Sequence, residues 1–177
     1  MPIVDVGSSI LLVIDMQARL MPAIHEGAEA IANARRLVQA AALLGVPALF
    51  TEQNPKGLGP TVPELGRDEA SVLSKMEFDA CRASGFGERL AEGKAAVIAG
   101  VEAHVCVLQT ALGLVEKGRR VFVVRDAIGS RRAESKDAAL RRMERNGVEI
   151  VTTEMVVFEW LGDARNPRFR EAVALIK

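Results

Sequence analysis

Short runs of consecutive apolar residues alternate with helix-like segments along the whole chain, and this alternation restricts the fold more than any other feature. We predict strands over residues 8–15, 46–52, 71–75, 94–101, 119–127 and 148–154. We predict helices over residues 27–45, 84–93, 105–118, 132–147, 154–162 and 166–177. Strands that are apolar throughout are typical of parallel sheets covered on both faces. The pattern predicts a three-layer α/β/α sandwich with a mostly parallel, about six-stranded, Rossmann-like sheet.

Length and charge limit the domain count and the partners. The 177 residues are expected to form one domain over 1–177, without repeats or linkers. Lys plus Arg and Asp plus Glu balance at 23 each, which argues against nucleic acid as a partner. Apolar runs such as ILLVI are too short to span a bilayer, and the N-terminus lacks the features of a signal peptide. Two cysteines without a C-x-x-C motif suit a reducing cytoplasm, so we expect a cytoplasmic protein without a membrane partner.

Three chemically reactive side chains follow three of the predicted strands. Asp15 ends ILLVI, Lys75 ends SVLS, and Cys106 follows AVIAGV after a short turn. Ligands of open α/β sheets bind beyond the carboxyl ends of the strands. A carboxylate, an ammonium and a thiol are therefore expected at the same edge of the sheet. The carboxylate can accept the thiol proton, and the ammonium stabilises both anions.

The role of Cys106 stays open on the residues alone. A lone cysteine near the start of a helix is more often a small core residue than a nucleophile, and a redox-sensing thiol is a third interpretation. Lys75 and the positive end of the following helix lower the pKa of the thiol, whereas Asp15 raises it. We expect the two positive influences to prevail modestly. The meeting of three groups at one edge is what favours a catalytic role.

No metal or cofactor site is predicted. The two histidines, His25 and His104, have no clustered Asp or Cys with which to hold zinc. His104 lies two residues before Cys106, so on one helix the two side chains would point to different faces. The segment GLGP, residues 57–60, resembles a phosphate-binding loop, but its proline lacks the N–H group that such a loop uses. We therefore expect no metal and no cofactor.

The three segments that carry these residues resemble the signature segments of a known family. LLVIDMQ with Asp15, SKMEFDA with Lys75 and GVEAHVCV with Cys106 are similar, in this order and spacing, to the isochorismatase-like cysteine hydrolases. The similarity runs nearly end to end. TEQNPKGLGPTVPELG and WLGDARNPRFREAVALIK resemble especially the isochorismatase domain-containing proteins, a subgroup of that family.

The resemblance implies a role for each residue. Asp15 would be the general base, Lys75 its electrostatic partner and Cys106 the nucleophile. A cis peptide bond between Val101 and Glu102 would turn backbone N–H groups inward, so that the amides of Glu102 and Cys106 form an oxyanion hole. The expected reaction is hydrolysis of a small amide or related C–N bond through a thioester intermediate.

Departures from the family narrow the activity. Nicotinamidases of this family hold a metal with an Asp and histidines after the second strand, and TEQNPKGLGP contains neither. True isochorismatases lack the nucleophilic cysteine, whereas Cys106 is present, and many members have Thr where this chain has Ala103. Two other classes remain as alternatives, a non-catalytic interaction protein on the same fold and a redox-sensing thiol protein. The complete Asp-Lys-Cys set favours hydrolysis.

The substrate pocket and the assembly are predicted in outline. Five residues in segments that should face the site are expected to bind a small-molecule substrate, although a structural role suits each equally: Gln17, Phe50, Gln53, Phe78 and His104. The sequence does not name the substrate. Because relatives form dimers or larger assemblies, we expect a homo-oligomer, although the apolar VVFEWL segment can close the core as well as pack against a partner.

Overall fold

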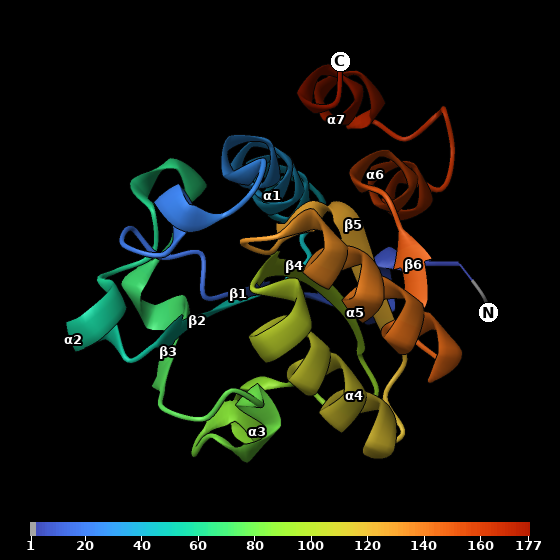
Figure 1. Cartoon of the computed structure of the whole chain (residues 1–177). Helices are drawn as coiled ribbons and strands as arrows, with labels where there is room; N and C mark the ends of the chain where they lie inside the picture. Colours follow the sequence, from blue (N-terminus) through green and yellow to red (C-terminus); the bar gives the residue numbers. More distant parts are fainter. Residues whose placement is uncertain (1–2) are drawn as a thin grey trace.

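The computed structural model describes residues 3–177 and contains a six-stranded sheet in which neighbouring strands are parallel (Figure 1). The strands are β1 (Ser9–Ile14), β2 (Ala48–Gln53), β3 (Val72–Lys75), β4 (Ala95–Val101), β5 (Val121–Gly129) and β6 (Glu149–Val151). Their order across the sheet is β3-β2-β1-β4-β5-β6. The predicted parallel sheet is confirmed.

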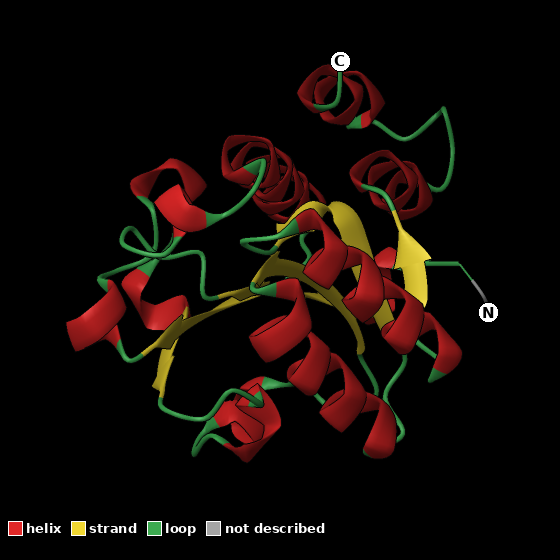
Figure 2. Ribbon diagram, viewed as in Figure 1, coloured by secondary structure: helices red, strands yellow, loops and turns green. Residues whose placement is uncertain are grey.

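Helices cover both faces of this sheet and complete the predicted three layers (Figure 2). On one side lie α1 (Gly27–Leu44), α6 (Thr153–Leu161) and α7 (Phe169–Leu175). On the other side lie α3 (Phe86–Arg89), α4 (Leu108–Glu116) and α5 (Ala133–Arg145), while α2 (Pro55–Leu58) belongs to the connection after β2. No helix within residues 3–177 is long and apolar enough to cross a bilayer.

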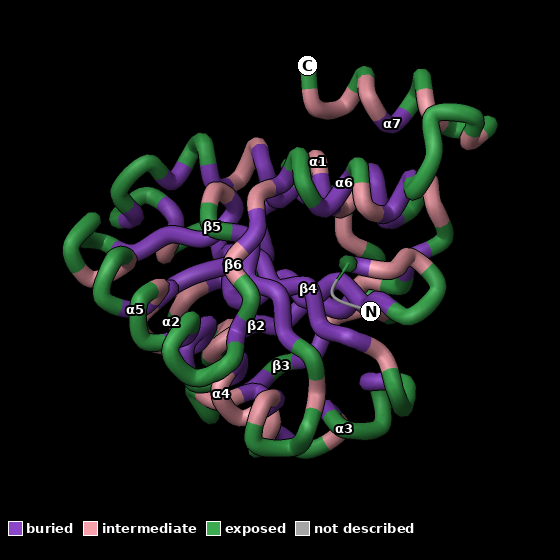
Figure 3. The backbone as a smooth tube through the Cα atoms, turned by 90° about the vertical axis from the view of Figure 1, so that its right-hand side faces the viewer, coloured by how far each residue is buried: buried purple, intermediate pink, exposed green. Residues whose placement is uncertain are grey.

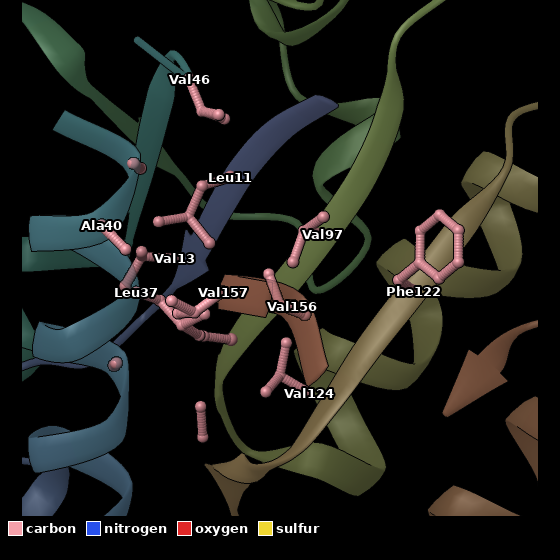
Figure 4. Packing of buried hydrophobic residues seen from close by; sticks show 14 of the residues in the cluster. Leu11, Val13, Leu37, Ala40, Val46, Val97, Phe122, Val124, Val156 and Val157 are labelled. Carbon is pink, nitrogen blue, oxygen red and sulfur yellow. The ribbon is translucent and has the colours of Figure 1, made fainter. Parts of the chain in front are cut away.

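The central strands β1 and β4 are buried along their whole length, as their uninterrupted apolar runs predict (Figure 3). Leu11 and Val13 of β1 and Val97 of β4 belong to the same core cluster as Leu37 of α1 and Val157 of α6 (Figure 4). The intervening residues of β1 belong to the second cluster, on the opposite face of the sheet. Full burial of one such side chain stabilises the fold by about 1.5–3 kcal/mol relative to exposure, so the two cores hold the strand ends in a fixed frame.

Several element boundaries differ from the sequence predictions, and two of the differences have a clear local cause. The helix predicted over 105–118 begins later, because Ala103–Val107 forms a π-helical turn and α4 follows it. The last strand ends before residue 152, because the hydroxyl of Thr152 accepts a hydrogen bond from the amide of Met155 and caps α6. The first difference matters for function, since the π-helical turn carries the cysteine in question.

Candidate active site

The register of the sheet brings the ends of neighbouring strands together. Ile14 of β1 lies opposite both Thr51 of β2 and Gly100 of β4, and the end of β2 lies beside the end of β3. Asp15, directly after β1, therefore lies between the strands that the other candidate residues follow. This is the edge at which the carboxyl ends of parallel strands offer a ligand site.

The carboxylate of Asp15 is buried and held on both oxygens. Its Oδ1 accepts a hydrogen bond of 2.7 Å from the hydroxyl of Thr51, and its Oδ2 accepts one of 2.7 Å from Nζ of Lys75. The backbone at Asp15 is left-handed, with φ at 51°, a conformation that aspartate adopts more readily than most residues. The amide of Asp15 also donates to the carbonyl of Thr51 at 3.1 Å. Its neighbours thus fix both the backbone and the carboxylate.

The ammonium of Lys75 is the positive partner of this carboxylate. The side chains of Lys75 and Asp15 are only 0% and 1% exposed. Nζ of Lys75 also donates to Oε1 of Gln53 at 2.8 Å and to the carbonyl of Glu77 at 3.1 Å. A buried charge is costly unless it is paired and hydrogen-bonded, and both conditions hold here.

Cys106 lies in the π-helical turn and is 6% exposed. The pKa of its thiol is raised to about 12, first by burial and second by the negative charge of Asp15. Lys75 acts in the opposite direction, while a hydrogen bond to Asp15 and the charge of Glu102 add to the rise. The expectation of a modestly lowered pKa is therefore wrong, because burial and Asp15 outweigh the ammonium. The same interactions show that the thiol is close to both Asp15 and Lys75.

The turn between β4 and α4 is shaped around the backbone of Glu102. The peptide bond between Val101 and Glu102 is cis. The amides of Val105 and Val107 both donate to the carbonyl of Glu102, at 3.0 and 3.2 Å. Within residues 3–177, the amide of Glu102 itself has no hydrogen-bond partner. That free donor suits an oxyanion hole, which for the amides of Glu102 and Cys106 stays a prediction.

Gly100, the second-to-last residue of β4, lies where β4 approaches β1 too closely for a side chain. Its φ is 136°, and a Cβ built there would lie 2.2 Å from the carbonyl oxygen and 2.6 Å from the amide nitrogen of Ile14. Any side chain at this position would force β4 away from β1. The close approach of these two strands is what brings the turn with Cys106 next to Asp15.

The carboxylate of Glu102 is tied to the loop after β5. It accepts hydrogen bonds from the amide of Arg131 at 3.0 Å and from Nε of Arg131 at 3.1 Å. A hollow of about 400 Å³ beside this pair is lined by His104, Arg131, Arg132 and Ser135. Nδ1 of His104 lies 3.0 Å from the hydroxyl of Ser130. His104, one of the five residues predicted to bind substrate, therefore lines this hollow.

Gln17 and Gln53, two of the other predicted substrate residues, are bonded within the protein. Nε2 of Gln17 donates to the carbonyls of Gln53 and Gly59 at 3.0 and 2.6 Å, and its Oε1 accepts from the amide of Gln53 at 2.8 Å. Gln53 bonds Lys75 through Oε1 and the carbonyl of Met76 through Nε2. Both amide groups are therefore engaged within the protein, that of Gln53 at the ammonium and that of Gln17 at the backbone of Gln53.

Of the two phenylalanines predicted to bind substrate, one is buried on the far face of the sheet and the other is exposed after β3. Phe50 is 2% exposed and belongs to the core on the α1 side of the sheet, whereas Cys106 belongs to the other core. The reason is the two-residue period of a strand, which points Thr51 toward Asp15 and Phe50 away from it. Phe78 follows β3 and is 52% exposed, and Met76, which also follows β3, is 67% exposed.

Two residues of the site were not predicted from the sequence. Thr51 lies opposite Ile14, the last residue of β1. Knowledge of how β1 pairs with β2 would therefore have placed the Thr51 hydroxyl at Asp15. Arg131 lies 29 residues from Glu102, and no local pattern connects the two. The pairing of β1 with β2 would thus have predicted Thr51, whereas no strand pairing predicts Arg131.

The described residues offer no ready metal centre. Among residues 3–177, no group of three or more His, Cys, Asp or Glu side chains is arranged to hold a metal ion. The carboxylate of Asp15 is bonded instead to Lys75 and Thr51.

The fold and the site define a three-layer α/β protein. Its parallel sheet carries a buried carboxylate–ammonium pair and a thiol at the carboxyl edge. The comparison with protein families is more specific. The chain belongs to the isochorismatase family, since the profile of the Isochorismatase domain matches residues 9–155. The predicted resemblance is therefore confirmed.

Individual relatives agree with this assignment over most of their length. Isochorismatase domain-containing protein 2 of Danio rerio is 38% identical over 170 residues, which cover 95% of this chain and 86% of the relative. The structure of MAR1 ribonuclease from Caenorhabditis elegans superimposes with a TM-score of 0.92 at 37% identity, covering 97% of this chain and 91% of the other. The YcaC gene product of Escherichia coli, described as an octameric hydrolase of unknown specificity, gives 0.91 at 30% identity, covering 98% and 88%.

Proposed function

We propose that this member of the isochorismatase family is a cysteine hydrolase that cleaves a small amide or related C–N bond through a thioester. The observation that carries the proposal is the buried group of Asp15, Lys75 and Cys106. Nζ of Lys75 lies 2.7 Å from Oδ2 of Asp15, and both charges act on the pKa of the Cys106 thiol. A buried charge pair stabilises a fold poorly compared with apolar residues of similar size, so a chemical role is the better reason for one beside a thiol.

The raised pKa of Cys106 determines how the reaction starts. With a pKa of about 12, the resting thiol is protonated at neutral pH. In the proposed first step, the sulfur attacks the carbonyl carbon as its proton moves to Asp15, and the carbonyl oxygen becomes an oxyanion. The C–N bond then breaks as Asp15 returns the proton to the leaving nitrogen, which leaves a thioester on Cys106.

The second half of the reaction restores the enzyme. Water gives a proton to Asp15 and attacks the thioester carbon, the C–S bond breaks, and the thiolate of Cys106 takes the proton back. Lys75 stays charged throughout and offsets the negative charge on Asp15 or on sulfur. The amides of Glu102 and Cys106 are proposed to bind the oxyanion, and one such donor contributes about 3–4 kcal/mol in a studied protease.

The geometry favours hydrolysis over the two alternative classes. A redox sensor needs a populated thiolate, and the raised pKa of Cys106 keeps the thiol protonated at neutral pH. A non-catalytic interaction protein has no need of a carboxylate bonded by Thr51 and Lys75 beside a thiol. Asp15→Asn, which keeps the shape of the side chain, distinguishes these classes, because it abolishes hydrolysis and leaves a binding function intact.

The test is a panel of small uncharged and charged amides scored by ammonia or amine release. Wild-type protein is compared with Cys106→Ser, Asp15→Asn and the matched control Cys81→Ser. We expect the first two variants to lose at least about a thousandfold in rate, and Cys81→Ser to keep the wild-type rate. Mass spectrometry of the quenched reaction should show the acyl group on the peptide that contains Cys106. Turnover that survives in Cys106→Ser would contradict the proposal.

The Caenorhabditis elegans relative is named a ribonuclease, so RNA belongs in the panel as a separate arm. This chain carries equal numbers of basic and acidic residues, 23 each, which does not favour binding to a polyanion. We expect amide hydrolysis that depends on Cys106 and no cleavage of RNA. RNA cleavage lost in Asp15→Asn would replace the amide proposal.

We also infer a homo-oligomer, a dimer or larger, in the cytoplasm. The Escherichia coli relative is octameric, and Met76 and Phe78 expose apolar surface beside Lys75. Cys81 and Cys106 are both free thiols, which suits a reducing compartment. Light scattering coupled to gel filtration measures the assembly, and a monomer at micromolar concentration would contradict it.

A further inference from the structure

The ammonium of Lys75 meets three hydrogen-bond acceptors, one for each of its N–H groups. An ammonium offers three donors. Nζ of Lys75 reaches Oδ2 of Asp15 at 2.7 Å, Oε1 of Gln53 at 2.8 Å and the carbonyl of Glu77 at 3.1 Å. With these three bonds made, no donor is left for a substrate or for water. Lys75 can therefore act on the thiol only through its charge.

Gln53 is itself fixed in the orientation that this coordination needs. Its Nε2 donates to the carbonyl of Met76 at 2.7 Å, so its Oε1 is the end that faces Lys75. Its backbone is held on both sides by Gln17, which donates to the carbonyl of Gln53 and accepts from its amide. A rotated amide group would place N–H against the ammonium and lose both side-chain bonds.

From these contacts we infer that Gln53 is a positioning residue, which holds the Lys75 ammonium against Asp15 and thereby sets the proton balance between Asp15 and Cys106. The inference rests on the proposed roles of those three residues. It assigns Gln53 and, behind it, Gln17 to the charged network instead of to the substrate. It also makes the neutrality of Gln53 the property that matters.

Replacing the neutral acceptor by an anion of the same shape tests that property. In Gln53→Glu, a carboxylate takes the place of the amide beside the ammonium, so Lys75 has two negative partners in place of one. The added negative charge offsets the ammonium that favours the thiolate, and so opposes ionisation of Cys106.

The chain offers a matched control for this substitution. Gln109 lies three residues after Cys106 but is exposed on α4. Gln109→Glu therefore makes the same chemical change close to Cys106 in sequence, where solvent screens the new charge. Cys81, whose pKa is likewise raised to about 12, first by burial and second by Asp79, serves as an internal reference for folding and reagent.

The experiment follows iodoacetamide labelling of both cysteines by peptide mass spectrometry between pH 8 and pH 10.5 in the full-length protein. A rise of one pKa unit lowers the thiolate fraction about tenfold. The nucleophilicity of a thiolate increases with its pKa, with a Brønsted coefficient of about 0.4–0.5, which returns about threefold. We therefore expect Gln53→Glu to slow labelling of Cys106 about threefold at each pH, with Cys81 unchanged, and Gln109→Glu to have less than half this effect.

Equal labelling of Cys106 in Gln53→Glu and Gln109→Glu, with Cys81 at its wild-type rate, would overturn the inference. If Gln53→Glu does not fold, Gln53→Leu replaces it, because Leu has a similar volume but accepts no hydrogen bond. Slower labelling of Cys106 alone is then expected, and labelling at the wild-type rate would overturn the inference. Labelling needs no substrate, so failure here is separate from failure of the amide panel.

Discussion

The two sides of the candidate site are constructed differently. On the side of β1, β2 and β3, buried side chains bond one another, and the charged pair of Asp15 and Lys75 is at most 1% exposed. On the side of β4 and β5, the backbone turns sharply, and Arg131 pairs with Glu102 while 61% of its side chain stays exposed beside an open hollow. A buried pair needs both of its partners, whereas an exposed pair is screened by water. The first side therefore holds the charged groups in fixed positions. The second side leaves an open hollow beside the turn that carries Cys106.

The largest loss of stability is expected where the two sides join. Gly100→Ala places a Cβ within 2.2 Å of a backbone atom of Ile14, at a φ of 136°. We expect the free energy of unfolding to fall by about 4 kcal/mol or more, because backbone strain of about 1–3 kcal/mol adds to overpacking of similar size. Urea denaturation measures it. Gly45→Ala is the control, because its new Cβ meets nothing within 4 Å. This variant should lose only about 1–2 kcal/mol, from the left-handed backbone alone. Equal losses would contradict this account of Gly100.

Removing one charge of the buried pair is expected to have the next largest effect. Lys75→Met leaves the carboxylate of Asp15 buried without its cation, which should cost about 3–5 kcal/mol. Adding Asp15→Asn removes the orphaned charge, so the double variant should recover a large part of the loss. A double-mutant cycle in urea checks both statements. A double variant that loses the sum of the two single losses would show that the pair is not coupled.

Alkaline pH should weaken the fold through its two thiols. Burial raises the pKa of Cys81 and of Cys106 to about 12, above the value of about 8.5 for an unfolded thiol. Between these values the unfolded chain has released its thiol protons and the folded chain has kept them, so stability falls as pH rises. The loss is at most about 1.4 kcal/mol per pH unit for each thiol.

The control for this pH effect is the double variant Cys81→Ala, Cys106→Ala. The chain contains no tyrosine, so lysines are the main other groups that titrate in this range. Urea midpoints at pH 8 and pH 9.5 should differ less in the double variant than in the wild type. The same pH dependence in both proteins would mean that the folded thiols titrate like unfolded ones.

The smallest effect is expected on the exposed side. Arg131→Met removes a guanidinium that is 61% exposed, while the amide of residue 131 still donates to Glu102. We expect a loss of about 0.5–1 kcal/mol that diminishes in high salt. Arg132→Met, where the side chain is 78% exposed, should cost less. A loss near that of Lys75→Met would remove the contrast between the two sides.

The sequence supported the fold and the main groups of the site because both follow from local patterns. Uninterrupted apolar strands predicted the parallel sheet, and the rule that ligands bind at strand ends selected Asp15, Lys75 and Cys106. The depth of burial is not a local pattern. Desolvation therefore reversed the expected direction of the Cys106 pKa. No property of the residues near Cys106 in the chain would have supplied that information.

The predicted pocket residues show a second limit. Nearness to Asp15 in sequence selects Gln17, and the expectation that their segment faces the site selects Phe50 and Gln53. In the structure, strand alternation turns Phe50 into the opposite core, Gln53 bonds the ammonium of Lys75, and Gln17 bonds the backbone of Gln53. Thr51 needed the register between β1 and β2, and Arg131 needed the packing of the loop after β5 against the turn. Contacts between distant segments supplied these assignments.

The place of β3 in the sheet has a consequence for how long the site stays assembled. β3 has four residues and is one of the two edge strands, paired with β2 alone. Edge strands open and close more often than central ones, on the timescales that amide hydrogen exchange reports. Lys75 is the last residue of β3, so each opening of that edge withdraws the ammonium from Asp15 while the central strands stay closed. The lifetime of the charge pair is therefore set by the outermost strand of the sheet.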